Sequence, residues 1–329
     1  RRLFVIHPVS SRPYVSSYTF RDICEWGIVT SIDTKHMLEM GSGIDPEKVK
    51  AGQRLYVISE GLPYFLNEIE PKIKVPYFLV TGRSDIQIDA ELAAHGLRPN
   101  LIRWYAVNVN LKENHPRIQQ IPLGIDNANW KFDGNPQGDI TLFFDVNDDD
   151  ISVEKDILIS FQRHTNSKQR NRCYDYFKDN LKKKCTFRKY NNEKRFTRDF
   201  LREYYVEIKR HKFNVCPPGA GFDCHRVWQT LILGSFPIVK DSWAWREFYD
   251  LPMWFVNGWQ EVTKDNINKK YEEICSNLKA GKYNLDKMSF DYWKRVMDND
   301  RFEFYRNYKS ENSGETIHKG FSLHELHIG

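Results

Sequence analysis

The sequence predicts an α/β protein with parallel sheets, divided into two domains. Continuous apolar runs of about four to eight residues alternate with amphipathic segments of helical length along most of the chain. Runs that are apolar at every position, rather than at every second one, are typical of parallel strands that helices cover on both faces. A length of 329 residues indicates two domains at the usual size of about 100–200 residues each.

Composition excludes two other classes of protein. Aromatic residues make up 14% of the chain and the net charge is only +5, whereas intrinsically disordered chains have few aromatics and a large net charge. The most apolar window, residues 230–239, is interrupted by Gly234 and Pro237 and is shorter than the ~18 residues that indicate a membrane span. We therefore expect a globular chain without a membrane span.

The first domain is expected over residues 1–135. Each of its predicted strands is a continuous apolar run, and the two predicted helices lie between such runs. The strands are expected at residues 3–6, 55–58, 77–80 and 101–109, and the helices at 63–73 and 88–95. Residues 136–155 are predicted to be the linker, in which Thr141–Phe144 can form a strand.

The second domain is expected over residues 156–310, and residues 311–329 form a polar tail. Strands are predicted at 156–161, 213–216 and 236–239, and helices at 169–183, 197–210, 224–233 and 289–308. Two such domains joined by a linker leave a cleft between them. In parallel sheets, ligands bind beyond the carboxyl ends of the strands.

The net charge conceals an uneven distribution. Residues 163–212 carry a net charge of +11, and the rest of the chain carries −6. A basic segment of this kind suits a solvated helical face, a nucleic-acid surface or the wall of a site for an anionic ligand.

The most informative segment is residues 213–240, which read as a strand, a glycine-containing loop, a helix and a second strand. Asp223 is the expected N-cap of the helix, and Gly234 suits the left-handed residue just past its end. His225 and Arg226 fall in the first turn, where a cation costs roughly 0.3–1 kcal/mol because of the helix dipole. A bound anion would reverse that cost.

These features together describe a phosphate or diphosphate pocket. The helix start offers free N–H groups, Gly219 and Gly221 permit close backbone approach, and Arg226 offers a fork of donors. The alternative is that both glycines only turn the chain and that Arg226 pairs with an acid elsewhere.

The run from Cys216 to Val239 resembles the nucleotide-sugar motif of exostosin-like glycosyltransferases, a GT-B family. The resemblance rests on the Pro-x-Gly-x-Gly loop at 217–221, the Asp-x-His-Arg helix start at 223–226 and the Leu-Gly-x-x-Pro-Ile-Val strand at 233–239. The segment from 157 to 170 is similar to the opening strand and donor loop of the family's second domain. The segment 121–124 is similar to the one that closes its first domain. The strong similarity covers about thirty residues, and a looser one covers most of 77–256.

The resemblance implies a GT-B fold, with two Rossmann-like domains facing across a cleft and a C-terminal helix that can cross back to the first domain. It implies transfer of a sugar from a UDP-sugar, with xylose as a first guess, to a carbohydrate or glycoprotein acceptor, with inversion. Arg226, the helix start and Arg163 or Arg170 would stabilise the leaving diphosphate, so we expect no metal. The residues carried over as donor-binding are Arg163, Thr165, Asn166, Arg170, Pro218, Gly219, Gly221, Asp223, His225, Arg226 and Gln229. The family usually has Glu at the last of these positions, where it binds the ribose, and an amide loses that charge-assisted bond.

An inverting displacement also needs a base near the acceptor hydroxyl, supplied by the first domain across the cleft. Asp85 follows the predicted strand 77–80, where such a group should lie, and His7, at the end of the first strand, is the second candidate. The alternatives are that Asp85 caps the helix that follows and that His7 is an ordinary core or loop histidine.

Two other functions stay open. Residues 142–145 followed by Asp148, Asp149 and Asp150 resemble a strand that ends in the Asp-x-Asp pair of a metal-dependent glycosyltransferase, which would hold Mn²⁺ or Mg²⁺. The basic segment with its interleaved aromatics suits a non-enzymatic protein that binds nucleic acid or another polyanion. Because those aromatics recur at helical spacing, we expect them in the core and expect no nucleic-acid partner.

The lack of a membrane anchor and of Asn-x-Ser/Thr acceptors in these residues favours a cytoplasmic or soluble viral or microbial enzyme. An anchor trimmed before Arg1 would place the protein in the Golgi lumen instead. The six cysteines are scattered without a C-x-x-C pair, so free thiols are expected rather than disulfides or a zinc site.

Overall fold

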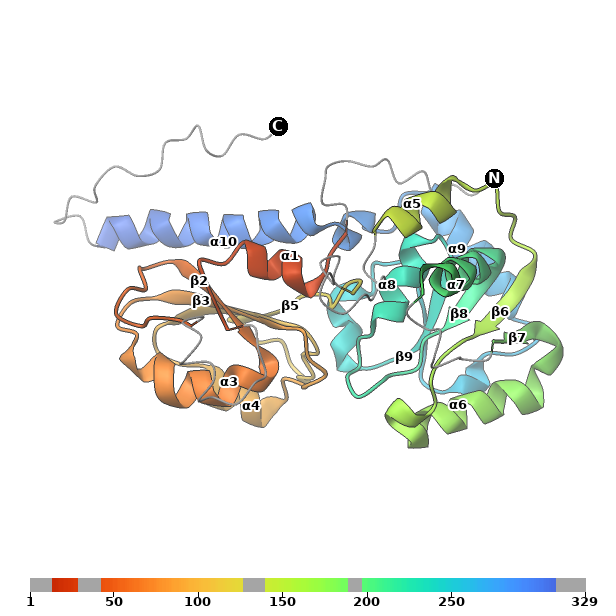
Figure 1. Cartoon of the computed structure of the whole chain (residues 1–329), viewed down its shortest axis with the longest axis horizontal. Helices are drawn as coiled ribbons and strands as arrows, with labels where there is room; N and C mark the ends of the chain where they lie inside the picture. The colour runs from red at the N-terminus through yellow and green to blue at the C-terminus, as the bar shows by residue number, and fades with distance from the viewer. Residues whose placement is uncertain (1–13, 29–42, 127–139, 189–196, 312–329) are drawn as a thin grey trace.

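The computed structural model describes residues 14–28, 43–126, 140–188 and 197–311. They form two α/β units, each built on a parallel sheet of five strands (Figure 1). The predicted α/β class with parallel sheets is therefore confirmed. The predicted strand at 3–6 and the candidate base His7, which follows it, lie outside the described residues, as do residues 312–329.

The first sheet follows the order of the chain, β1-β2-β3-β4-β5, and every neighbouring pair is parallel. Its strands are β1 (Trp26–Ile28), β2 (Gln53–Ile58), β3 (Tyr77–Gly82), β4 (Leu101–Ala106) and β5 (Ile118–Gln120). The strand predicted at 101–109 ends at Ala106, because Asn108 adopts a left-handed backbone with φ of 55° that no strand continues through.

A sequential strand order makes every crossover move in the same direction, so right-handed connections place their helices on one face of the sheet. The helical elements in the described crossovers are α3 (Leu62–Tyr64), η2 (Phe65–Ile69), η3 (Glu70–Lys72) and α4 (Ala90–Gly96). The first three occupy the predicted helix 63–73 as irregular turns, with Pro71 in the last of them, where it lacks an N–H and crowds the preceding turn.

The opposite face of the first sheet is covered by α1 (Ser17–Asp22) and by α10 (Phe290–Glu311), which lie above the sheet in Figure 1. Alternate residues of β3 accordingly enter two different cores. Tyr77 and Leu79 pack with residues of α3 and α4, and Phe78 and Val80 belong to the core that includes Phe290.

The second sheet has the order β10-β9-β8-β6-β7, and its neighbouring strands are also parallel. Its strands are β6 (Lys155–Ile159), β7 (Cys185–Phe187), β8 (His211–Val215), β9 (Phe236–Lys240) and β10 (Trp254–Val256). Its helices are α6 (Ser167–Asn180) and α9 (Ile267–Lys279), which contribute to one core, and α7 (Arg198–Arg210) and α8 (His225–Ile232), which contribute to the other. Single-turn 3-10 elements are η1 (Ser59–Gly61), η5 (His164–Asn166), η6 (Lys182–Lys184), η8 (Trp259–Glu261) and η9 (Leu285–Met288), and η7 (Trp243–Phe248) is longer.

This strand order makes the second sheet doubly wound. The chain leaves β6 for β7 on one side, and then crosses to β8 on the other side. The point between β6 and β8 where the direction reverses is a topological switch point, and the crevice beyond its strand ends is where such sheets bind ligands.

The strand predicted at Thr141–Phe144 is wrong, because these residues lie in helix α5 (Ile140–Asp148). Leu142, Phe143 and Val146 are buried along one face of α5, and the ring of Phe143 stacks on Tyr205 of α7 at 4.5 Å. Lys209 of α7 donates to the carbonyls of Val146 and Asn147, at the negative end of the helix dipole. The predicted linker thus contains a helix that packs on the second unit.

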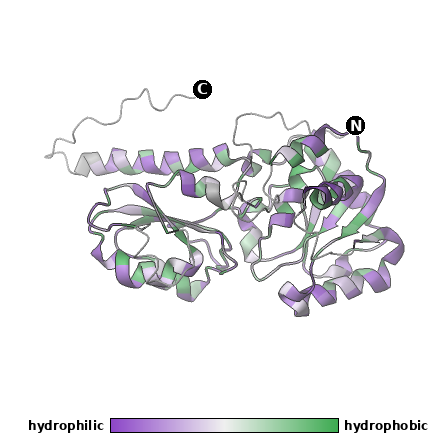
Figure 2. Cartoon of the chain, viewed as in Figure 1, coloured by the Kyte–Doolittle hydropathy of each residue, from purple (hydrophilic) through white to green (hydrophobic). Residues whose placement is uncertain are grey.

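Helix α10 begins beside the second unit and runs along the first sheet (Figure 1). At its start, Trp293 packs against Phe248 of η7. Further along, Asp298 pairs with Arg54 of β2 and Asp300 with Arg103 of β4. The helix mixes hydrophilic with hydrophobic residues (Figure 2), as a helix with one face on a core requires.

All six cysteines lie within the described residues, and each is a free thiol there. Among the helices that the structure describes, none is both long and apolar enough to span a membrane.

Candidate functional site

The loops at the carboxyl ends of the two sheets meet each other. Asp223, just before α8, donates its backbone N–H to the side chain of Asn108, which follows β4, at 2.9 Å. Its carboxylate accepts the N–H of Leu123, after β5, at 2.8 Å. The ring Nδ1 of His225 lies 2.8 Å from the carbonyl of Gly124, and since a carbonyl only accepts, this nitrogen carries the proton. The motif residues Asp223 and His225 thus dock the second unit on the first.

Gly221 is a glycine because of this contact. A Cβ at this position would lie 2.7 Å from Nδ2 of Asn108, closer than real Cβ contacts allow. Asn108 is fully buried and donates the same Nδ2 to the carbonyl of Ser84, so it has no room to move. The need for glycine at 221 therefore comes from the packing of the two units, whereas the sequence motif suggested approach to a phosphate.

The expectation that Asp223 is the N-cap of α8 is wrong. The N-cap is Cys224, whose side chain makes no capping bond. The carboxylate of Asp223 is occupied instead by the indole N–H of Trp228, at 2.8 Å, and by Leu123. The start of α8 is consequently left without a side-chain cap at the edge of the switch point, which favours an anion there. Gly234 has the expected left-handed backbone, with φ of 69°.

Burial raises the pKa of the Asp223 carboxyl to about 6, against the opposing effect of its N–H donors. A folded-state pKa above the ordinary value of ~3.9 means that the carboxyl stabilises the fold fully at pH values below that ordinary value. This contribution is lost as the pH rises through about 6.

The indole N–H resonance of Trp228 should therefore titrate with a midpoint near pH 6, followed by NMR. The titration should vanish in Asp223→Asn. Trp104 is the matched control, since its buried indole donates to the hydroxyl of Thr81, which does not ionise. A midpoint near pH 4 for Trp228 would show that burial does not dominate this carboxyl.

Two predicted donor-binding residues hold the glycine loop from the side of α6. Asn166 caps α6 and donates Nδ2 to the carbonyl of Gly219 at 2.8 Å. Arg170 is buried, and its guanidinium donates to the carbonyls of Pro218, at 2.9 Å, and Gln162, at 2.7 Å. The geometry makes Arg170 a residue that positions the loop.

Arg226 lies at the switch point itself. Its Nε donates to the carbonyl of Ser160, directly after β6, at 2.9 Å. The guanidinium groups of Arg226 and Arg170 both lie about 6 Å from the ring of Phe161. Burial and the charge of Arg226 lower the pKa of Arg170. Two cations held this close together create a strong local attraction for an anion.

The remaining predicted donor-binding residues are less closely gathered. Thr165 is exposed in η5, and Arg163 is exposed and lies over the ring of Tyr174. Gln229, the expected ribose ligand, is buried within α8.

A pocket of about 140 Å³ opens at the carboxyl edge of the second sheet, beyond β8 and β9. Its lining consists of Gln169, Cys216, Pro218, Phe222, Lys240, Asp241 and Trp245. Only Pro218 among them was predicted as a ligand residue. Lys240 and Asp241 were missed, although their place directly after an apolar run that forms a strand was a usable signal.

The first unit presents carboxylates at its own carboxyl edge. Asp85 follows β3, is exposed, and lies near enough to Arg170 for its charge to raise the pKa of that guanidinium. The cap of α4 is Asp89, which accepts the N–H of Leu92, so Asp85 is not the helix cap. Glu60 follows β2 and accepts the hydroxyl of Ser84 at 2.9 Å. Sequence reasoning missed Glu60, although it holds the same place after its strand as Asp85 does.

The acidic tract does not form the predicted strand end. Asp145 lies within α5 and pairs with Arg198, and Asp149, just after it, pairs with Arg202. The predicted metal site required an Asp-x-Asp pair at the end of a strand, and these aspartates lie instead within or just after a helix.

Comparison with models of known protein families finds no match to this chain, and no curated protein matches it.

Proposed function

We propose that the protein is a glycosyltransferase of GT-B type that transfers a sugar from a UDP-sugar, with xylose as the first candidate, to a glycan acceptor. One observation carries the proposal. The switch point of the second sheet, with the uncapped start of α8 and Arg226 beside it, faces the carboxyl edge of the first sheet, where Asp85 lies.

On the donor side, the leaving nucleoside diphosphate gains negative charge in the transition state. The N–H groups at the start of α8 and the guanidinium of Arg226 would stabilise that charge through preorganised donors. Lys240, which lines the neighbouring pocket, adds a further cation. This stabilisation would come from the chain's own donors, so the proposed reaction would need no divalent ion.

On the acceptor side, the base must reach the attacking hydroxyl from the face opposite the leaving group. Asp85 belongs to the first unit, and its charge acts on Arg170, which holds the proposed donor loop. In the proposed reaction this carboxylate would act from the side opposite the diphosphate, as an inverting displacement requires.

Replacing Arg226 with alanine should weaken UDP binding about 10- to 100-fold, the usual value of a charged hydrogen bond, measured by calorimetry. Arg226→Lys should recover part of the loss, because it keeps the charge without the fork. The control is Arg172→Ala, which removes an exposed cation on α6 and should leave affinity unchanged. Equal affinities of the wild type and Arg226→Ala, with unaltered melting temperatures, would refute the assignment of this site.

A further inference from the structure

Trp243 is a tryptophan on the surface of the second unit. It lies at the start of η7, three residues after β9, and half of its surface is exposed. Within the described part of the chain, large apolar side chains with comparable exposure are Tyr249 and Phe302. Single exposed apolar side chains are common on protein surfaces, so the case for Trp243 depends on what holds and surrounds its ring.

The indole is held in place by both units of the protein. The guanidinium of Arg246 lies over its ring at 5.0 Å. Arg246 in turn donates to the side chain of Asn114 and to the carbonyls of Leu111 and Lys112, all in the first unit. The ring of Trp243 is thus a positioned platform at the junction of the two units.

Polar groups surround the platform. Trp243 lines a shallow hollow of about 20 Å³ together with Glu113, Asn114, His115 and Glu247. Carboxylates, an amide and an imidazole can accept or donate hydrogen bonds to hydroxyl groups, and an indole face can cover an apolar face of a ring.

The hollow adjoins the pocket at the switch-point edge. The segment 240–247 lines both of them, since Lys240, Asp241 and Trp245 face the pocket and Trp243 and Glu247 face the hollow. A molecule seated on Trp243 would therefore be separated by one short turn of chain from this pocket, which neighbours the proposed donor site.

We infer that Trp243 is the stacking platform of an acceptor subsite that takes an uncharged saccharide. A sugar ring offers an apolar C–H face to the indole and hydroxyls to the surrounding groups. Glu113 and Glu247 bring two negative charges to the hollow and Arg246 brings one positive charge, so its lining is negative overall. A sulfated or uronic-acid glycan is disfavoured there. This inference rests on the proposed function, for which it names the acceptor class.

The test is saturation-transfer NMR with uncharged disaccharides as probes, namely cellobiose, lactose, xylobiose and N,N′-diacetylchitobiose. At least one should bind with a millimolar Kd, and Trp243→Ala should weaken that binding by about tenfold or more. Trp243→Phe should retain most of it, because a smaller ring still stacks. Phe302→Ala, which removes an equally exposed ring from α10, should change nothing.

The outcomes separate this inference from the proposed function. Binding of none of the four probes, preference for a sulfated heparin tetrasaccharide, or undiminished binding by Trp243→Ala overturns the subsite. Calorimetry with UDP on the same proteins tests the donor site separately from the saccharide subsite. Saccharide binding that depends on Trp243 in a chain that does not bind UDP would keep the subsite and refute the transferase.

Discussion

Asp85→Asn is expected to lower the rate of sugar transfer by about 10²–10⁴-fold, the usual contribution of a general base, and to leave UDP affinity unchanged. Asparagine has nearly the same shape as aspartate but cannot take a proton from the acceptor hydroxyl. The measurement is kcat for transfer with the UDP-sugar identified by a thermal-shift screen, beside calorimetry with UDP.

The structure favours Asp85 over other carboxylates at this edge for a physical reason. It is exposed, it does not cap α4, and its charge acts on Arg170 across the junction. Glu60 is also exposed, but its carboxylate is already the acceptor of a hydrogen bond from the Ser84 hydroxyl within the first unit.

Asp89→Asn is the matched control, because asparagine caps a helix about as well as aspartate does and the same loop loses one negative charge. It should transfer sugar at the wild-type rate. If Asp85→Asn does the same, the base is another group, and Glu60→Gln becomes the next variant to assay.

The central strands could be predicted from the sequence, and the strands at the sheet edges could not. Central strands such as β3 and β8 are buried on both faces and appear as apolar runs. The four missed strands, β1, β5, β7 and β10, are the edges of the two sheets and have three residues each. A three-residue edge strand with partly exposed side chains leaves little periodicity to detect.

Helix α5 shows a different limit. Its buried residues Leu142, Phe143 and Val146 follow helical spacing, but Phe143 and Phe144 are adjacent, as they would be in a short buried strand. The stacking of Phe143 on Tyr205 and the hydrogen bonds from Lys209 stabilise the helix. Tyr205 and Lys209 lie about sixty residues further along the chain. Short apolar runs do not carry such information.

For the candidate site, the local sequence located the glycine loop and the start of α8 but did not reveal why each of their residues is needed. Asp223, Gly221 and His225 have their roles set by Leu123, Asn108 and Gly124 of the other unit. These are contacts over about a hundred residues of chain, which a motif read in isolation cannot reveal.

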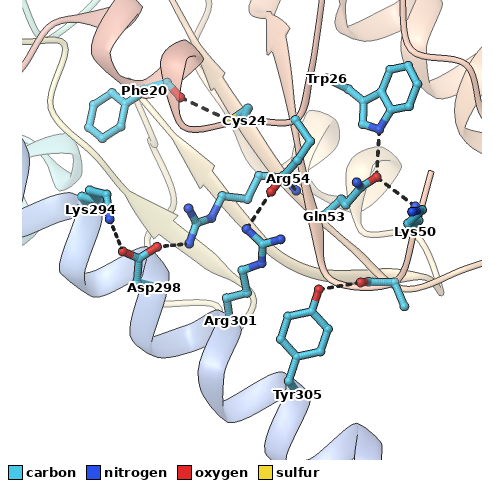
Figure 3. Close-up of polar contacts among 12 residues, drawn as sticks. Phe20, Cys24, Trp26, Lys50, Gln53, Arg54, Lys294, Asp298, Arg301 and Tyr305 are labelled. Carbon is cyan, nitrogen blue, oxygen red and sulfur yellow. Dashed lines mark hydrogen bonds and ion pairs between the residues drawn. The ribbon is translucent and has the colours of Figure 1, made fainter. Parts of the chain in front are cut away.

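The second large effect concerns stability. Asp298→Ala should lower the free energy of unfolding by about 3 kcal/mol, the low end for a broken buried ion pair because Asp298 is itself partly exposed. Arg54 is only 3% exposed, and its Nη2 lies 2.5 Å from the carboxylate of Asp298 (Figure 3). Removing the carboxylate leaves a buried guanidinium without its counter-charge. Denaturant unfolding measures the change.

The cost should be large because α10 completes the first unit. Within the described residues, the sequential strand order leaves one face of the first sheet without crossover helices. Helix α10 covers that face through Asp298, through Arg301, which pairs with Glu25, and through Tyr305, which donates to the carbonyl of Ala51 (Figure 3). Weakening α10 therefore exposes apolar residues such as Phe78, whose ring meets Phe304 edge-on.

The pH dependence has a definite sign. Burial raises the pKa of Asp298, but hydrogen bonds from Lys294 and Arg54 outweigh that effect and hold the pKa below its ordinary value. The pair thus stabilises the fold above the ordinary pKa of an aspartate, and this contribution is lost as the pH falls through the lowered pKa. The difference in stability between Asp298→Ala and the wild type should therefore become smaller under strongly acidic conditions.

Two further variants distinguish an unpaired buried charge from simple loss of helix packing. Lys294→Ala removes the exposed partner of the same carboxylate and should cost under about 1 kcal/mol, as surface pairs do. Adding Arg54→Met to Asp298→Ala removes the stranded guanidinium, so the double variant should regain most of the lost stability. If the double variant is no more stable than Asp298→Ala alone, the buried charge of Arg54 is not what makes α10 necessary, and apolar packing against β3 must carry the cost instead.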